Sequence, residues 1–211
     1  GCPYECIFCD NSVFGRKVRF FSHEYVLREI ECLISKFGAR EIMFVDDTFP
    51  CGKKRFEKIL AGMIENKFKI KWSCMANAND LDEKILRLMK EAGCWQIAIG
   101  IESGDDNILI TIKKKASSFE IAKIANSARK LGIFVKGFFM IGHPGETTET
   151  LEKTRRFALS LPLSDVTCTI ATHVKGSQFY KMALSGEYGP LTQRRRRLNS
   201  ATGNRFLFLP G

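Results

Sequence analysis

The sequence predicts an α/β fold with a parallel sheet and helical crossovers. Short apolar runs of strand length alternate along the chain with longer segments whose apolar residues recur every three or four positions. Polar clusters follow several of the strand-like runs, as is typical of parallel sheets, whose ligands gather at the carboxyl ends of the strands. Strands and helices that alternate at this spacing indicate repeated strand–helix–strand units.

The first predicted unit is a helix followed by a strand. Ser22 is a suitable N-cap and Gly38 a suitable end for the helix. A strand is expected over residues 41–45, and it runs into the polar loop 46–50. The helix carries one apolar stripe, made by Val26, Ile30, Leu33 and Phe37.

The same unit then repeats. A second helix is expected before a strand over residues 70–75, and a third helix before a strand over 96–101. The third helix opens on a pair that resembles a capping box, Asp80 with Glu83, and Gly93 ends it. The apolar face of the second helix is formed by Phe56, Ile59, Leu60, Met63 and Ile64.

Two further units complete the pattern. A capping box of Ser117 with Glu120 opens the fourth helix, and a strand over residues 133–141 follows it. A fifth helix ends near Leu161 and leads to a strand over residues 166–171. Five strands are therefore expected.

Unusual polar clusters stand at the ends of four of these strands. Because the carboxyl ends of parallel strands meet at one edge of a sheet, the clusters are expected to share one active site. They are Asp46–Asp47, Ser73 to Asn77, Glu102–Ser103 and Gly142 to Glu146.

The chain begins with three cysteines in a C-x-x-x-C-x-x-C spacing: Cys2, Cys6 and Cys9, with Phe8 directly before the last. Structural zinc sites usually close with four ligands, whereas iron–sulfur clusters accept thiolates at spacings of this kind. Three thiolates on a four-iron cluster leave one iron open to another ligand. Buried thiols without a metal are the alternative interpretation.

Cys2, Cys6, Phe8 and Cys9 resemble the signature of the radical S-adenosylmethionine (SAM) superfamily. Residues 1–9 are most similar to the catalytic core of the branch whose members often carry a cobalamin-binding domain. The resemblance implies a partial (β/α)6-type TIM-like barrel of parallel strands, with its first strand expected before Gly1 and missing from this chain. It also implies that the three cysteines hold a [4Fe–4S] cluster whose open iron binds the amino and carboxylate groups of SAM.

The resemblance implies roles for the first two polar clusters. Asp46 and Asp47 stand where relatives place the motif that receives the SAM amino group, and a solvated turn is the alternative. Ser73 and Asn77 belong to the next cluster, which is expected to contact the cofactor. Relatives commonly carry arginine where Asn77 stands, so the contact to the SAM carboxylate stays open, and a loop asparagine is the alternative.

The other two clusters are expected near the nucleoside half of SAM. Residues 100–104 resemble the Gly-Ile-Glu-Ser-Gly motif of the family, in which Glu102 and Ser103 lie near the ribose. Residues 142–147 resemble Gly-x-Pro-Gly-Glu-Thr, which implies cofactor contacts from Gly142, Pro144 and Gly145, where the backbone can approach adenine closely. His143 takes the place of a usually apolar residue, and we interpret it as a spacer. The segment 176–180 resembles a further motif of the same branch.

Composition sets the remaining expectations. The net charge is +10, but five of the positive charges are arginines after Pro190, where no acid occurs. Residues 1–188 are expected to form the radical SAM core, and residues 189–211, with Arg194–Arg197, a basic tail that is disordered or a non-native end. No run of about eighteen apolar residues suggests a membrane span. Four of the eight cysteines lie in apolar periodic segments, which favours a reducing cytoplasm.

The resemblance implies a radical SAM enzyme that cleaves SAM reductively to methionine and a 5′-deoxyadenosyl radical, which abstracts hydrogen from an unknown substrate. Its expected partners are a flavodoxin- or ferredoxin-like one-electron donor and a small-molecule substrate. Full-length relatives suggest cobalamin-dependent methylation or ring formation, with cobalamin bound by a domain absent from this chain. The alternatives are a methylthiotransferase-like enzyme that modifies tRNA and a zinc-binding interaction module.

Overall fold

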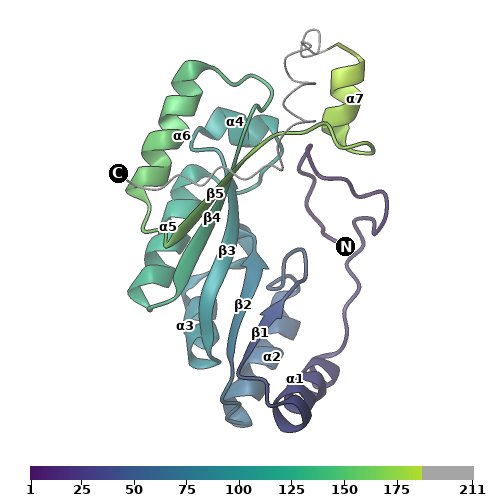
Figure 1. The fold of residues 1–211 in the computed structure, drawn as a ribbon, viewed down its shortest axis with the longest axis vertical. Helices are drawn as coiled ribbons and strands as arrows, with labels where there is room; N and C mark the ends of the chain where they lie inside the picture. Colours follow the sequence, from purple (N-terminus) through teal and green to yellow (C-terminus); the bar gives the residue numbers. More distant parts are fainter. Residues whose placement is uncertain (187–211) are drawn as a thin grey trace.

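The computed structural model describes residues 1–186, which form one sheet of five parallel strands (Figure 1). The strands lie side by side in sequence order, and each neighbouring pair is parallel. Among the described residues, β1 and β5 are the two edges of the sheet, so the barrel is open. The predicted α/β class and the partial barrel are confirmed. The strands are β1 (Glu41–Phe44), β2 (Lys71–Ala76), β3 (Cys94–Glu102), β4 (Phe134–Ile141) and β5 (Asp165–Ile170).

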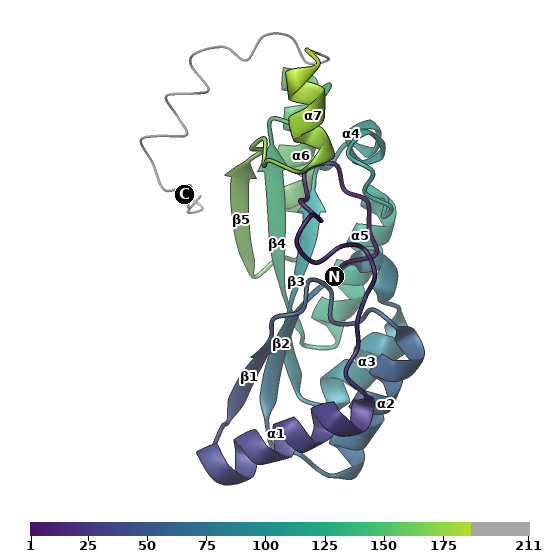
Figure 2. The same cartoon turned by 90° about the vertical axis from the view of Figure 1, so that its right-hand side faces the viewer.

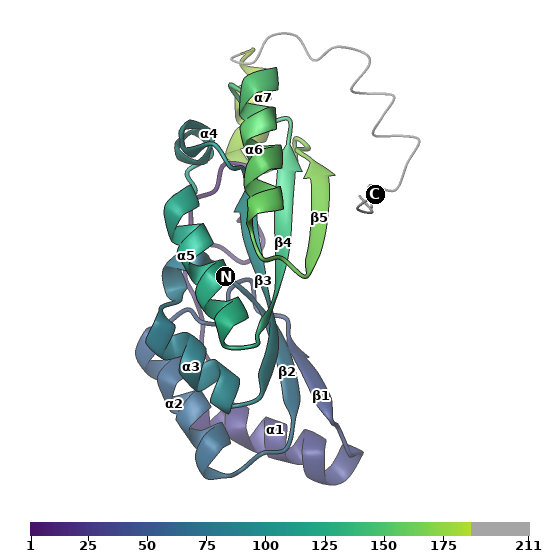
Figure 3. The same ribbon diagram turned by 90° about the vertical axis from the view of Figure 1, so that its left-hand side faces the viewer.

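All five predicted helices are present: the first precedes β1, and the other four lie in the crossovers between the strands. Helices α2, α3 and α5 lie on one face of the sheet, as the two side views show (Figures 2 and 3). Three short helical segments were not predicted: η1 (Ala78–Asp80), α4 (Asp106–Thr111) and α7 (Gln178–Leu184). The five predicted helices are α1 (His23–Phe37), α2 (Lys53–Glu65), α3 (Glu83–Glu91), α5 (Ser118–Lys130) and α6 (Thr148–Ser160).

The N-caps predicted for α1 and α5 are present, and the N-cap predicted for α3 is not. The Ser22 side chain accepts a hydrogen bond from the Tyr25 amide at 3.2 Å, and the Ser117 capping box is present. The prediction that Asp80 opens α3 is wrong, because Asp82 accepts the hydrogen bond from the Ile85 amide at 2.8 Å. Asp80 lies two residues earlier and has other partners, which place it in the candidate site.

The core lies between the sheet and the helices on its covered face. Trp72 on β2, Phe56 and Ile59 on α2, and Ile97 on β3 are fully buried there. Each such side chain stabilises the fold by about 1.5–3 kcal/mol relative to an exposed one. The indole of Trp72 also donates a hydrogen bond to the Ala92 carbonyl at 2.8 Å, so its one polar atom is satisfied. This packing fixes the strands whose carboxyl ends carry the site.

The N-terminal segment crosses from α1 toward α7 at the carboxyl end of the sheet (Figure 2). Residues 1–22 therefore bring the loop that holds Cys2, Cys6 and Cys9, called the cysteine loop below, to the edge where the polar clusters were predicted. No helix within residues 1–186 is both long enough and apolar enough to cross a membrane. The predicted basic tail, with Arg194–Arg197, lies outside the described residues.

Candidate active site

The cysteine loop is fastened to the carboxyl edge of the sheet by backbone hydrogen bonds. The amide of Ile7 donates to the Ile112 carbonyl at 3.1 Å, and the carbonyl of Ile7 accepts from the Phe179 amide at 2.8 Å. The Ile7 side chain is itself buried in the core. Cys6 and Cys9 close a turn around this anchor, since the Cys9 amide donates to the Cys6 carbonyl at 3.1 Å. The turn that carries two of the thiols is therefore held between α4 and α7.

A second anchor joins the loop to the ends of β1 and β2. The Tyr4 hydroxyl donates to one carboxylate oxygen of Asp80 at 2.6 Å, and the Thr48 hydroxyl donates to the other at 2.7 Å. The Asn77 amide in turn donates to the Thr48 hydroxyl at 3.2 Å. Burial is the main cause that raises the pKa of Tyr4, and the hydrogen bond to Asp80 adds to it. Both carboxylate oxygens of Asp80 thus hold the loop against the sheet.

The thiols share one electrostatic environment. Burial is the main cause that raises the pKa of the Cys9 thiol to about 12, and the charges of Cys6 and Glu102 add to it. Burial also raises the pKa of Cys6, while the positive charge of Lys114 opposes that rise. Cys2 is a further neighbour of both thiols. A bound metal cation would deprotonate such thiols, because coordination favours the thiolate.

The three thiols do not form a ready-made site for a single metal ion. Among residues 1–186, no three Cys, His, Asp or Glu side chains meet in an arrangement that would hold one metal ion. A zinc site needs its ligands around one point. The thiolates of a four-iron cluster bind different iron atoms, so their sulfur atoms stay farther apart. That the three thiols of this anchored loop hold a four-iron cluster stays a prediction.

Glu102 and Lys114 form a buried ion pair beside the thiols. The Lys114 Nζ lies 3.5 Å from Glu102 Oε1, and the two side chains are only 7% and 10% exposed. A Cβ at Gly100 would lie 2.5 Å from that carboxylate oxygen and 2.9 Å from the Lys114 ammonium, so this glycine makes room for the pair. Burial raises the pKa of Glu102, and Lys114 lowers it. The backbone of Glu102 has a φ of 67°, which is uncommon for a residue with a side chain.

Lys114 was not identified from the sequence. It is the middle residue of three consecutive lysines, and Lys113 and Lys115 are exposed while Lys114 is not. The sequence does not indicate that Lys114 is buried, because a run of lysines usually marks a solvated surface. Only the folded chain shows that one of the three is turned inward, toward Glu102.

The residues predicted at the ends of β1 and β2 differ in their exposure to solvent. Asp46 and Asp47 are exposed after β1, and Asp47 lies beside the start of the cysteine loop, 3.8 Å from the amino group of Gly1. Ser73 lies inside β2, three residues before its carboxyl end, and is buried. The Asn77 side chain accepts a hydrogen bond from the Asn79 amide at 3.2 Å, as in the loop-asparagine alternative. Only the two aspartates are open to a ligand.

Ser103 is engaged within the protein. It is fully buried, and its hydroxyl shares a hydrogen bond with the Thr154 hydroxyl at 3.0 Å. It also accepts a hydrogen bond from the Asp105 amide at 3.2 Å. These contacts fasten the turn after β3 to α6, so a cofactor contact from Ser103 stays a prediction.

The glycine-rich loop after β4 is closed by its own glutamate. The amides of Gly142 and His143 donate to Glu146 Oε2, the latter at 3.2 Å, and the Glu146 amide donates back to the His143 carbonyl at 3.2 Å. Gly142 and Gly145 have φ values of 88° and 77°, which glycine adopts without strain. Pro144 is buried and Gly145 exposed. The amides of residues 142 and 143 are thus used inside the loop, and the cofactor contacts expected from Gly142, Pro144 and Gly145 stay predictions.

Comparison with known proteins identifies the family. The family model of the radical SAM superfamily matches residues 1–158. The chain is 36% identical over 186 residues to an uncharacterized methyltransferase of Pyrococcus horikoshii, covering 88% of this chain and 40% of the relative. It is 30% identical over 162 residues to an anaerobic magnesium-protoporphyrin IX monomethyl ester cyclase of Cereibacter sphaeroides, covering 75% of this chain and 26% of that protein. The chain thus spans less than half the length of these relatives.

A solved structure shows the same fold. It is the structure of the radical SAM methyltransferase TsrM from Kitasatospora setae with cobalamin and a [4Fe–4S] cluster bound. The match has a TM-score of 0.81 at 17% sequence identity, and it covers 88% of this chain and 38% of the TsrM chain. At that identity the match concerns the fold alone. The family match decides against a zinc-binding interaction module and confirms the predicted enzyme class. The chain belongs to the radical SAM superfamily, whose cofactors are a [4Fe–4S] cluster and SAM.

Proposed function

We propose that Cys2, Cys6 and Cys9 hold the [4Fe–4S] cluster and that SAM binds between this loop and the ends of β1 to β4. One observation carries the proposal: the loop is anchored at the carboxyl edge of the sheet, beside a buried ion pair. The pair is formed by Glu102 and Lys114, and both charges act on the pKa of the Cys6 thiol. This edge is where ligands of parallel barrels gather.

The proposed reaction begins with reductive cleavage of SAM. When bound, the cluster supplies one electron to the sulfonium group, which breaks a carbon–sulfur bond and leaves methionine and a 5′-deoxyadenosyl radical that abstracts hydrogen from the substrate. A flavodoxin- or ferredoxin-like protein is the proposed electron donor. The task of this chain is then to orient SAM and to exclude water from its sulfonium group.

The charged groups at the edge match the methionine end of SAM. Asp46 and Asp47 are exposed carboxylates beside the loop, suited to the ammonium group. Lys114 is a buried cation suited to the carboxylate, and it supplies the positive charge that Asn77 cannot. Glu102, next to Lys114, can accept hydrogen bonds from ribose hydroxyls. The ammonium and the carboxylate of SAM are thus each matched by an opposite charge on the protein.

The net reaction we favour is cobalamin-dependent methylation. The relative in Pyrococcus horikoshii is described as a methyltransferase, and the TsrM structure is that of a methyltransferase with cobalamin bound. In this proposal cobalamin is bound by a domain outside the present chain. Modification of tRNA is the second candidate, and it rests on the basic residues Arg194–Arg197, which lie outside the described part of the chain.

Anaerobic reconstitution with iron and sulfide tests the proposal. The reconstituted chain should release 5′-deoxyadenosine from SAM when a reductant is added, and Cys→Ser variants at 2, 6 and 9 should each abolish it. Cys32→Ser is the matched control, since this half-buried thiol lies on α1 away from the loop. Continued deoxyadenosine release by any of the three loop variants would refute the assignment. Repeating the assay with cobalamin and a methyl acceptor separates methylation from the tRNA candidate.

A further inference from the structure

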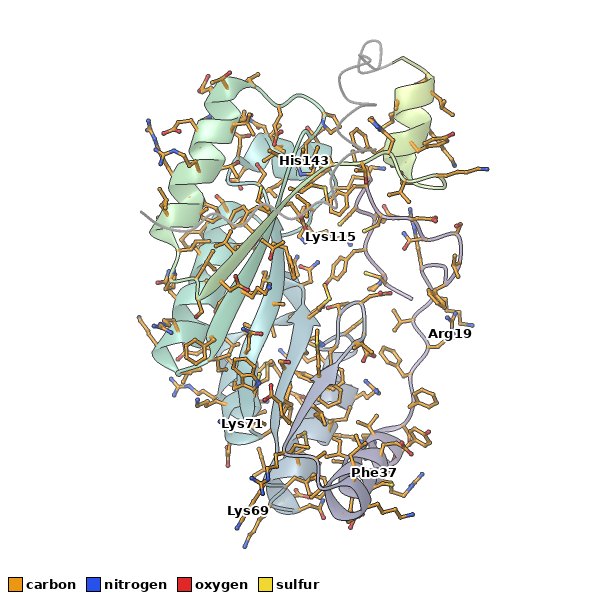
Figure 4. All side chains as sticks on the ribbon, viewed as in Figure 1. Arg19, Phe37, Lys69, Lys71, Lys115 and His143 are labelled. Carbon is orange, nitrogen blue, oxygen red and sulfur yellow. The ribbon has the colours of Figure 1, made fainter. Side chains whose placement is uncertain are left out.

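His143 is a buried imidazole at the carboxyl end of the sheet. It follows Gly142 in the loop between β4 and α6, beyond the carboxyl end of β4 (Figure 4). Only 5% of the residue is exposed. Its ring centroid lies 5.9 Å from that of Phe8, the residue directly before Cys9. The imidazole therefore lies next to the loop that carries the proposed cluster ligands.

Neither nitrogen of this imidazole has a hydrogen-bond partner. Both Nδ1 and Nε2 of His143 are buried, and no group within residues 1–186 donates to them or accepts from them. A buried polar group without a partner costs free energy, typically about 1–3 kcal/mol. An apolar residue of similar size would avoid that cost. The ligand-free protein thus gains nothing in stability from a histidine at this position.

The backbone beside His143 is already occupied. Its amide donates to Glu146 Oε2 at 3.2 Å, and its carbonyl accepts from the Glu146 amide at 3.2 Å. The amide of Gly142 donates to the same carboxylate. A ligand that reaches this part of the loop therefore meets the side chain of His143 as an available hydrogen-bonding group.

We infer that the His143 imidazole hydrogen-bonds the purine edge of SAM and so selects adenine. The inference rests on the proposed function, since it takes SAM to lie beside the cysteine loop. The charged and hydroxylated parts of SAM are matched by Asp46, Lys114 and Glu102, which leaves the flat, neutral base for the apolar surroundings of Phe8 and His143. A neutral imidazole offers one donor and one acceptor. The two ring nitrogens point in different directions, so one of them reaches the purine edge, where the acceptor nitrogen receives a hydrogen bond from the N6 donor of adenine.

Burial keeps the imidazole in the form that this contact needs. Desolvation lowers the pKa of His143 to about 4, so the ring is neutral near pH 7. The nitrogens are covered in the ligand-free chain, with Phe8 beside them. Entry of the base therefore requires a neighbouring group to shift, and Phe8 of the cysteine loop lies beside the imidazole.

Two variants of the cluster-loaded chain test the inference. His143→Leu removes both hydrogen-bonding atoms, and His143→Gln keeps a donor and an acceptor. The dissociation constant of SAM is measured by calorimetry, and so is that of its hypoxanthine analogue S-inosylmethionine, in which the donor at position 6 becomes an acceptor. Thermal unfolding of the apo-protein is recorded in parallel. This last readout does not depend on the cluster or on activity.

The wild type should bind SAM about tenfold more tightly than the analogue. His143→Leu should bind SAM about tenfold more weakly and lose the preference, while its apo-protein unfolds at a higher temperature than the wild type. His143→Gln should keep most of the preference. A His143→Leu variant that binds SAM as tightly as the wild type, with the preference intact, overturns the inference alone. A wild type that binds no SAM overturns the proposed function and the inference with it.

Discussion

The cysteine loop is flanked by two polar groups of opposite character, one half-buried and one buried. On the side of β1 and β2, Asp80 receives short hydrogen bonds from Tyr4 and Thr48 on both of its oxygens. On the side of β3 and β4, the Lys114 ammonium lies 3.5 Å from the Glu102 carboxylate, and the backbone of Glu102 has a positive φ. On the same side, the imidazole nitrogens of His143 have no hydrogen-bond partner within residues 1–186. The first group is complete without a ligand and holds the loop. The second is incomplete, as expected of a surface whose partner is a cofactor.

The largest expected effect of a substitution in these two groups is the loss of SAM affinity on replacing Lys114. In Lys114→Met, SAM should bind about a hundredfold more weakly, because a buried charge that pairs with the ligand is lost. Lys114→Arg should recover part of the affinity. Equilibrium binding to the cluster-loaded protein measures both. Lys115→Met is the matched control, since this neighbouring lysine is exposed and should bind SAM like the wild type. Equal losses at the two positions would contradict a role for the buried pair.

The incomplete side should also respond to acid. The folded-state pKa of His143 is lowered from 6.5 to about 4. Between these values the unfolded chain takes up a proton that the folded chain does not, so stability falls as the pH falls. The free energy of unfolding should drop by about 3 kcal/mol between pH 6.5 and pH 4 through this residue. Denaturant titrations of the wild type and His143→Leu isolate the effect, and identical pH dependence in the two would contradict it.

The complete side should behave as a structural anchor. Tyr4→Phe removes one hydrogen bond to a carboxylate and should lower the free energy of unfolding of the apo-protein by about 2 kcal/mol. Its discrimination between SAM and S-inosylmethionine should not change. Tyr180→Phe serves as the control for the loss of a phenol on α7. A changed preference between the two ligands in Tyr4→Phe would contradict the division between the two sides.

The smallest effect is expected at the N-terminus of α5, outside both groups. Ser117→Ala removes the capping box of α5 and should cost about 1 kcal/mol of stability. Deoxyadenosine release per bound cluster should be unchanged, because α5 packs on the covered face of the sheet. Thermal unfolding and the release assay together check this. A loss of release at constant stability would show that the site extends further than proposed.

Local sequence patterns were enough to predict the sheet and its crossovers. Strand alternation and caps gave five strands and five helices, with strand ends within about two residues. The six-residue α4 and seven-residue α7 were missed, because so few residues show no period. Asp80 was mistaken for the cap of α3 because spacing alone cannot distinguish it from Asp82, two residues later.

The site was predictable where its residues form short motifs and not where it depends on distant partners. The cysteine spacing, Glu102 and the glycine loop were all recognised along the chain. Lys114 became visible only through Glu102, twelve positions away, and the role of Asp80 through Tyr4, 76 positions away. The cofactor contact expected at Gly142 stays a prediction, and the sequence does not indicate that a local residue, Glu146, accepts a hydrogen bond from its amide.

The most direct test of the account is electron paramagnetic resonance of the anaerobically reconstituted and reduced chain, recorded before and after SAM is added. The account predicts the signal of a reduced four-iron cluster that changes when SAM binds the open iron, and loss of that signal in Cys2→Ser, Cys6→Ser and Cys9→Ser. A signal that is insensitive to SAM, or one that survives loss of a loop cysteine, would contradict it.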